Sequence, residues 1–170
     1  MKVNLGCGDR YAEGWVNVDS GSPHKMDFAV DLRSDLPWSE LSITHAYAGH
    51  LLEHLTIDEC RVLLSNLLPC MVYLGELMVV GPDVAVAQRM IDDGADMVGA
   101  TMDSLRFGAG RWDGDVHRWG WTAIATEELL LDVGWTQVRT LHIDEVGPFW
   151  PVADRRPKWQ RAVHARRAAS

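Results

Sequence analysis

The chain has few cysteines, no long uninterrupted apolar run and little positive charge over most of its length. Its three cysteines, Cys7, Cys60 and Cys70, are odd in number and lack a Cys-x-x-Cys pair, which predicts reduced thiols rather than a disulfide framework. The longest apolar stretch, residues 63–80, is broken by polar residues and a proline, so it predicts no membrane span. No basic and apolar leader opens the sequence, and we therefore expect a cytoplasmic protein.

Positive charge is concentrated at the C-terminus. The net charge is −8, yet residues 155–170 carry six basic side chains and no acidic one, so the rest of the chain is more acidic still. An acidic body repels a phosphate backbone, which makes nucleic acid an unfavourable partner and favours a small-molecule one. We expect the basic segment 155–170 to form the last strand and a solvated tail.

The length and composition fit one domain. A chain of 170 residues, 47% apolar and 24% charged, is typical of a globular protein that buries about two-thirds of its unfolded surface. We therefore treat residues 1–170 as a single domain.

A glycine turn near the N-terminus points to a ligand site. The apolar run 2–5 breaks into Gly6-Cys7-Gly8, and a second short apolar run, 16–19, ends on Asp19. Glycine allows a sharp turn and a close approach of the backbone to a ligand, and exposed N–H groups in such a turn favour an anionic group. A carboxylate that closes the next strand suits a vicinal diol. The pattern predicts a pocket for a nucleoside with an anionic tail.

An ordered series of segments extends this pattern over nearly the whole chain: Leu5-Gly6-Cys7-Gly8, Gly14-Trp15-Val16-Asn17-Val18-Asp19, Val30-Asp31-Leu32, Leu36-Pro37-Trp38 and His50-Leu51-Leu52-Glu53-His54-Leu55. The series resembles the class I S-adenosylmethionine-dependent methyltransferases, within them the methyltransferase type 11 group. The resemblance implies an enzyme with S-adenosylmethionine as cofactor. It also implies an α/β, Rossmann-like sheet with strand order 3-2-1-4-5-7-6, strand seven being antiparallel.

The same resemblance implies the cofactor site. Gly6 and Gly8 would line the methionine end, Asp19 would meet the ribose hydroxyls, and Asp31 with the backbone of Leu32 would meet the adenine. Leu5, Cys7 and His50 complete the expected cofactor-binding set. Strand ends of open α/β sheets are where such ligands bind.

The hydrophobic pattern predicts strands at 2–5, 16–19, 28–32, 43–49, 77–80, 138–143 and 159–165, and helices at 56–69, 84–93 and 122–133. The first two connections are too short for the crossover helices that parallel neighbours normally need. One sheet face near the first strands must therefore be covered otherwise. Trp15, Trp38, the 84–121 segment or a second subunit in a homodimer are the options.

Two histidines are the candidate catalytic residues. His50 directly follows the fourth expected strand, and His117 lies in segment 94–121, which we expect to be a loop or lid inserted into the domain. Trp112, Trp119 and Trp121 flank His117 and would form one wall of an acceptor pocket.

A metal site is the alternative use of these histidines. His50-x-x-Glu53-His54 is similar to the Glu-x-x-Glu-His motif with which small-RNA 2′-O-methyltransferases, helped by a distant histidine, hold a divalent metal, but His50 replaces the first glutamate. We interpret Glu53 and His54 as residues that stabilise the start of a helix, and we predict no metal.

The sequence as a whole predicts methyl transfer from S-adenosylmethionine to a small-molecule or sugar-containing acceptor, with a hydroxyl slightly favoured over an amine. A nucleic-acid methyltransferase is one alternative, although Asn/Asp-Pro-Pro-Tyr is absent after the fourth strand, where the chain reads Ala46-Tyr47-Ala48-Gly49-His50. A non-catalytic S-adenosylmethionine-binding or partner subunit is the other.

Overall fold

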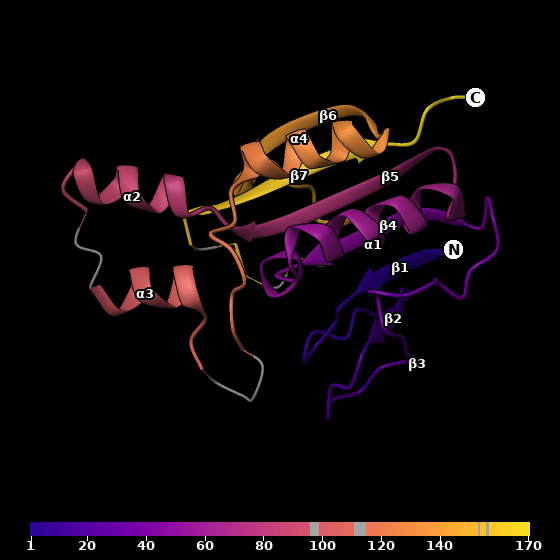
Figure 1. The fold of residues 1–170 in the computed structure, drawn as a ribbon, viewed down its shortest axis with the longest axis horizontal. Coiled ribbons are helices and arrows are strands. Elements are labelled where there is room, and N and C mark those ends of the chain that lie inside the picture. Colours follow the sequence, from indigo (N-terminus) through magenta and orange to yellow (C-terminus); the bar gives the residue numbers. More distant parts are fainter. Residues whose placement is uncertain (96–98, 111–114, 153, 156) are drawn as a thin grey trace.

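A computed structural model describes residues 1–95, 99–110, 115–152, 154–155 and 157–170. In this part of the chain, seven strands form one sheet with the order β3-β2-β1-β4-β5-β7-β6 (Figure 1). The strands are Lys2–Leu5 (β1), Val16–Asp19 (β2), Phe28–Ala29 (β3), Ile43–Gly49 (β4), Met71–Pro82 (β5), Thr136–His142 (β6) and Gln160–Arg166 (β7). Strand β7 pairs antiparallel with both β5 and β6, whereas the pairs from β3 to β5 are parallel. Both the predicted order and the antiparallel strand are confirmed.

The helices are Leu52–His54 (η1), Ile57–Cys70 (α1), Val84–Asp92 (α2), Gly99–Phe107 (α3), Ala123–Val133 (α4) and Ile143–Glu145 (η2). Helix α1 begins at a capping box, in which Thr56 accepts from the Glu59 N–H and the Glu59 carboxylate accepts from the Thr56 N–H. Thr122 caps α4, and Gly134 ends it with φ +106°, a left-handed conformation that favours glycine. These helix boundaries match the expected ones closely.

Helices α1 and α4 lie together on one face of the sheet (Figure 1). Their apolar sides pack against alternate strand residues, such as Leu77 and Val79 of β5, to form the main core. Cys60 and Cys70 lie in this core, and all three cysteines are buried and unbridged, as predicted for Cys70. Trp38 packs against the same core from the segment between β3 and β4.

The opposite face lacks the first two crossover helices. Residues 6–28 are all described, and none of them is helical, which confirms the shortened connections. Trp15 covers this face together with residues 143–152, which we call the arm, between β6 and β7. Trp150 of the arm lies 5.8 Å from Trp15, ring centroid to ring centroid. Of the expected covers, Trp15 was right and Trp38 was wrong, because Trp38 packs on the other face.

Three expected elements differ from the observed ones. Strand β3 has two residues rather than five, because a turn closed by Ser34 N–H to the Asp31 carbonyl follows it. Strand β5 is longer than 77–80, because its polar Glu76 is neutralised inside the sheet by Arg166 of β7. The segment 94–121 is not all loop. It contains α3, whose Met102 and Leu105 pack against Ala87 of α2.

Within the described residues, no helix has the length and apolar character needed to cross a bilayer.

Candidate active site

A small cavity opens at the carboxyl ends of β1 and β2. Four of the predicted cofactor residues, Gly6, Asp19, Asp31 and Leu32, line it. Ser20, Arg33, Leu51 and Leu55 complete the lining. The fold therefore brings Gly6 and Leu32, which are 26 positions apart in the sequence, to one cavity. The volume of this cavity is only about 60 Å³.

The glycine turn has the expected backbone. Gly6 and Gly8 have φ angles of +61° and +51°, a region in which a side chain is strained. At Gly6 a Cβ would also lie 2.7 Å from Leu51 Cδ1. Both glycines are therefore favoured by their conformation, and Gly6 alone also lies close against the Leu51 side chain, since a Cβ at Gly8 would meet nothing within 4 Å.

Asp19 anchors the turn to the cavity. Its carboxylate accepts hydrogen bonds from the N–H groups of Gly8 (3.0 Å), Gly21 (3.2 Å) and Ser22 (3.2 Å). A carboxylate has about four acceptor sites, so the three bonds fix its orientation and leave room for a hydroxyl donor. Asp19 is thus a fixed acceptor at a strand end, where open α/β sheets bind their ligands.

Asp31 is paired with a residue that the sequence analysis missed. Arg33 Nε and Nη2 donate to its two carboxylate oxygens at 2.9 and 3.0 Å. These bonds and the guanidinium charge hold the pKa of Asp31 below its usual range. Both side chains are about half exposed, and exposed ion pairs contribute little to stability, so Arg33 can leave Asp31 at small cost. The Asp-x-Arg spacing was the available signal.

The other expected cofactor residues lie behind the cavity or beside it. Leu5 and Cys7 are buried, and the Cys7 N–H donates to the Val18 carbonyl, so neither contributes to the cavity lining. Burial, reinforced by Asp19, raises the pKa of the Cys7 thiol to about 11. Gly8 does not line the cavity, but its N–H donates a hydrogen bond to Asp19, which does.

His50 lies at the end of β4, outside the cavity lining. Its Nδ1 is 3.0 Å from Glu53 Oε1 and its Nε2 is 2.9 Å from Gln160 Oε1. Gln160 Nε2 donates to the Asp154 carbonyl, which turns the amide oxygen toward His50. Each ring nitrogen of His50 therefore faces an oxygen that can accept a hydrogen bond. A histidine ring donates from both nitrogens only when it is protonated. Gln160, the third member of this chain of contacts, gave no signal in the sequence.

His117 lies next to η1, in the segment that follows α3. The Arg118 N–H donates to the Glu53 carbonyl, and Trp119 Nε1 donates to the Leu52 carbonyl. Trp121, by contrast, is fully buried in the main core. The expected tryptophan wall is therefore wrong for Trp121, and Trp112 lies outside the described residues.

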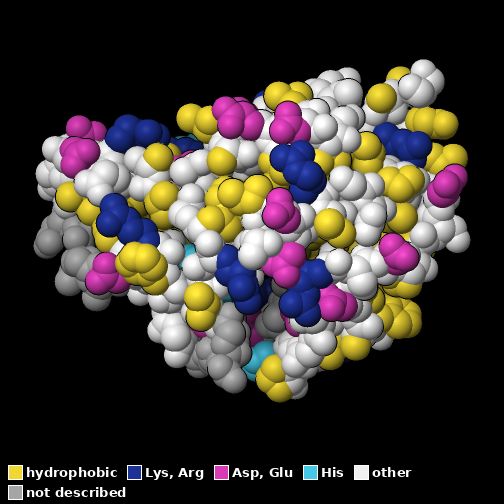
Figure 2. Space-filling model, in the orientation of Figure 1, with side chains coloured by type: hydrophobic (Ala, Val, Ile, Leu, Met, Phe, Trp, Pro, Cys, Tyr) yellow, Lys and Arg dark blue, Asp and Glu magenta, His cyan; other side chains and the backbone are white. Residues whose placement is uncertain are grey.

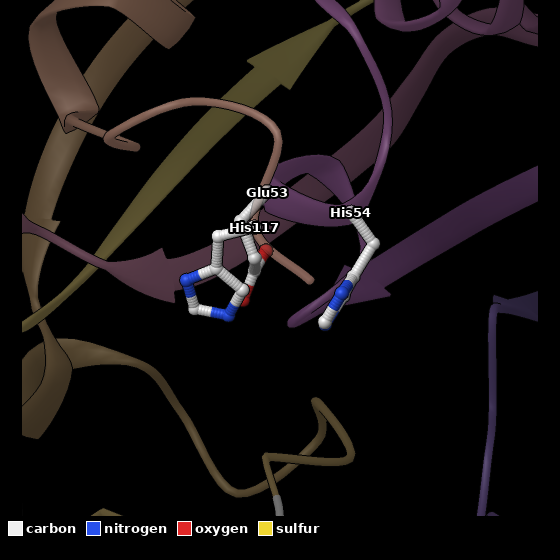
Figure 3. Close-up of side chains that lie close together, drawn as sticks. All are labelled: Glu53, His54 and His117. Carbon is white, nitrogen blue, oxygen red and sulfur yellow. The ribbon is translucent and has the colours of Figure 1, made fainter. Parts of the chain in front are cut away.

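Glu53, His54 and His117 form a compact cluster (Figure 3). Each offers one ligand atom, and these atoms lie within 4.8 Å of one another. The rings of His54 and His117 are 4.9 Å apart, edge to face. Neither Glu53 nor His54 caps α1, since Thr56 and Glu59 do so, and η1 has no side-chain cap. The described contacts therefore give Glu53 and His54 no capping role at the start of α1.

The electrostatics of this cluster follow from burial. Burial lowers the pKa of His54 below its usual value, against the opposing charge of Glu53. Burial by itself would raise the pKa of Glu53, but the hydrogen bond and charge of His50 bring it below its usual value. The cluster therefore favours a neutral His54 beside a charged carboxylate.

The basic segment at the C-terminus is largely engaged by the fold. Arg155 donates to carbonyls of the arm, Arg166 pairs with Glu76, and Arg167 donates to the Pro69 and Met71 carbonyls. Lys158 pairs with Asp144. Of these residues only Arg167 follows β7, and its two bonds hold it against the fold. Figure 2 shows acidic and basic side chains interspersed over the face that carries α1 and α4.

Comparison with known proteins identifies the fold. No family model matches the chain, and no curated protein matches it by sequence. It is similar to a SAM-dependent methyltransferase from Archaeoglobus fulgidus, with 13% identity and a TM-score of 0.61 over 97% of this chain and 85% of that one. A SAM-dependent methyltransferase from Methanosarcina mazei gives 13% identity and 0.58, over 99% of this chain and 92% of that one.

Human N-acetylserotonin methyltransferase, solved in complex with SAM, gives 13% identity and a TM-score of 0.59. The match covers 98% of this chain and 47% of the human one, so this chain spans about half of that protein. Together with the strand order, these matches show that the chain has the fold of the class I S-adenosylmethionine-dependent methyltransferases.

Proposed function

We propose that the protein binds S-adenosylmethionine and transfers its methyl group to a small-molecule or sugar-containing acceptor, at a hydroxyl. The observation that carries this proposal is the convergence of Gly6, Asp19, Asp31 and Leu32 on one cavity at the carboxyl edge of the sheet. This edge is where open α/β sheets bind their ligands.

The residues present fit this cofactor. The glycine turn gives close backbone approach, because a Cβ at Gly6 would fill space next to Leu51. Asp19 supplies a fixed acceptor for a ribose hydroxyl. Asp31 supplies an acceptor for the adenine amino group once Arg33 releases it. The volume of about 60 Å³ is small beside the roughly 300–1,000 Å³ of ligand pockets, so we expect Arg33 to move on binding.

Bound S-adenosylmethionine supplies an electrophilic methyl group on a sulfonium. The tasks left to the protein are alignment of the acceptor with that methyl group and exclusion of water, together with removal of the proton when the acceptor is a hydroxyl. We place the acceptor beside His50 and His117, because both flank the segment 51–55 that lines the cavity with Leu51 and Leu55. The insertion 94–121, which carries His117, would act as a lid over it.

His117 is the better placed of the two histidines to receive a proton. Its Nδ1 lies 2.8 Å from the Leu105 carbonyl, which accepts the Nδ1 proton and leaves the lone pair on Nε2. His50 faces acceptors at both ring nitrogens, so its role is to hold Glu53 and Gln160 in place.

Two measurements test the proposal. Calorimetry with S-adenosylmethionine and S-adenosylhomocysteine should show one site per chain. A screen of metabolite pools with a labelled methyl donor should show transfer to a hydroxylated small molecule. Absence of nucleoside binding would overturn the proposal. Binding without transfer to any pool would favour a non-catalytic binding subunit, and steeply salt-dependent binding to nucleic acid would favour the nucleic-acid alternative.

A further inference from the structure

We propose that Glu53, His54 and His117 form a binding site for one divalent transition-metal ion, and that the hydroxyl acceptor completes its coordination. The second clause rests on the proposed function, whereas the first does not. This site replaces the sequence-based prediction of no metal.

The geometry brings one carboxylate and two imidazoles together from two separate parts of the chain. Glu53 and His54 belong to η1, and His117 comes from the segment between α3 and α4, more than 60 residues later. Their ligand atoms lie within 4.8 Å of one another. Ligands on opposite sides of an ion with bonds of about 2.0–2.1 Å are at most about 4.2 Å apart. Small side-chain rotations are therefore enough to close the site.

Both histidines are oriented as metal ligands usually are. His54 Nδ1 lies 3.2 Å from the Val116 carbonyl, and His117 Nδ1 lies 2.8 Å from the Leu105 carbonyl. A carbonyl is only an acceptor, so each ring carries its proton on Nδ1 and its lone pair on Nε2. A second hydrogen bond of this kind fixes the tautomer and the ring orientation of ligating histidines.

The third ligand is a buried carboxylate with an unused oxygen. The Glu53 side chain is 1% exposed, and its Oε1 accepts from His50 Nδ1. Its Oε2 is buried and has no hydrogen-bond partner among the described residues. An unsatisfied buried carboxylate oxygen is costly, and a cation removes that cost. The charges of Glu53 and Asp115 both act at His54, which adds to the attraction for a cation.

The ligand types restrict the metal. Two imidazoles with one carboxylate suit Zn²⁺, Mn²⁺, Fe²⁺ or Co²⁺, whereas Ca²⁺ and Mg²⁺ prefer oxygen ligands alone. Three protein ligands leave at least one coordination position open, which distinguishes catalytic from structural zinc sites.

The site lies next to the cofactor cavity along the chain, because Leu51 and Leu55 line that cavity on either side of Glu53 and His54. A hydroxyl on the metal loses its proton more readily, as metal-bound water does. The proton passes to solvent water, an oxygen lone pair forms the bond to the methyl carbon, and the carbon–sulfur bond breaks. Its electron pair stays on sulfur, which leaves S-adenosylhomocysteine. His117 then acts as a ligand rather than as the base.

The test uses the full chain after removal of metal with a chelator. Titration with Co²⁺, followed by its visible absorption, and calorimetry with Zn²⁺ and Mn²⁺ should show one ion per chain. Glu53→Gln and His117→Ala should each weaken binding at least tenfold, as loss of a ligand does. His24→Ala, which removes an exposed histidine, should bind as the unaltered chain does.

S-adenosylhomocysteine binding, measured separately for each variant, reports whether it is folded and whether the proposed function holds. No saturable metal binding in a chain that binds S-adenosylhomocysteine would overturn the metal site and leave the proposed function intact. Metal binding in a chain that does not bind S-adenosylhomocysteine would overturn the proposed function and leave the metal site intact. Equal weakening by His24→Ala would show that the ion binds elsewhere and overturn the site.

Discussion

At the scale of single residues, Asp19 has the most demanding position. It accepts hydrogen bonds from three backbone N–H groups and, in the proposed function, from a ribose hydroxyl as well. Asp19→Asn keeps the shape but replaces one acceptor oxygen with a donor. We expect a loss of S-adenosylhomocysteine affinity of tenfold or more, by calorimetry. Asp9→Asn, an exposed residue of the same turn paired with Arg10, is the matched control and should bind normally.

His117 is expected to act on turnover and not on cofactor affinity. In the proposed function it lies on the acceptor side, whether it takes a proton or holds a metal, and it does not line the cofactor cavity. His117→Ala should therefore leave the dissociation constant for S-adenosylhomocysteine within about twofold, while methyl transfer falls by about 10²-fold or more, the range of a lost general base. Equal activity in the variant would reject any role for this histidine in catalysis.

His164 of β7 makes the stability of the fold depend on pH. It is 5% exposed and pairs with Glu76, beside Arg166 and Arg139. Burial lowers the pKa of His164 below its unfolded value of about 6.5. Below that pH the unfolded chain binds a proton that the native chain does not, so the free energy of unfolding falls as the pH drops, by at most about 1.4 kcal/mol per unit.

Glu76 extends this loss to lower pH. Burial alone would raise the pKa of Glu76, but the bonds from Arg166 and His164 bring it below its usual value, so its contribution is present above about pH 4.5 and is lost as the pH falls further. Urea unfolding of His164→Gln should show a shallower decline between pH 6.5 and 5 than the unaltered chain. Identical slopes in that window would contradict the assignment.

At the scale of elements, Asp83 links two helices. It is 4% exposed, and its Oδ1 caps α2 through the Ala85 and Val86 N–H groups. Its Oδ2 accepts from the Ala123 N–H at the start of α4. One carboxylate at the end of β5 therefore sets the start of both helices.

Asp83→Ala should lower the free energy of unfolding by about 2–4 kcal/mol, because it removes a cap and leaves buried N–H groups unpaired. Thr122→Ala, which removes one capping bond of α4 to the Ala125 N–H, is the control and should cost about 1 kcal/mol. Chemical denaturation measures both. A cost for Asp83→Ala no larger than that for Thr122→Ala would contradict the double role.

Elements with local chemical signals were predictable, and elements defined by distant contacts were not. The capping box at Thr56 and the stop at Gly134 located α1 and α4 within about a residue. Strand β5 was underpredicted because Glu76 interrupts its apolar pattern, and its neutralising partner Arg166 lies 90 residues away. Helix α3 was missed because its weak amphipathic pattern is satisfied by packing against α2.

At the scale of the whole molecule, the arm replaces two missing helices. Trp150 is 7% exposed and packs with Trp15 over Tyr47 and Met78 of the sheet. Trp150→Ala should lower the free energy of unfolding by about 3–5 kcal/mol. Its neighbour Phe149 is 48% exposed, so Phe149→Ala should cost clearly less.

A small effect of Trp150→Ala in urea unfolding would mean that something other than the arm covers this face. A homodimer would do so, and light scattering of the unaltered chain then decides between the two covers. The sequence correctly indicated that one face of the sheet lacks its crossover helices. It could not show what covers that face, because the covering segment lies about 130 residues after the first strands.

Part of the cavity lining could likewise be predicted from the sequence. Gly6, Asp19 and Asp31 were found because glycines and strand-end carboxylates are visible in one dimension. Arg33, Gln160 and the meeting of His117 with Glu53 and His54 were not, because they depend on how η1 and the segment after α3 pack together.

The most direct measurement is the structure of the full chain crystallised with S-adenosylhomocysteine. We expect the nucleoside at the carboxyl edge of β1 and β2, with a ribose hydroxyl on Asp19 and the adenine beside Asp31 and Leu32, from which Arg33 has moved away. A nucleoside bound elsewhere, or an Asp19 carboxylate turned away from the sugar, would contradict the assignment of this chain as a methyltransferase of the expected kind.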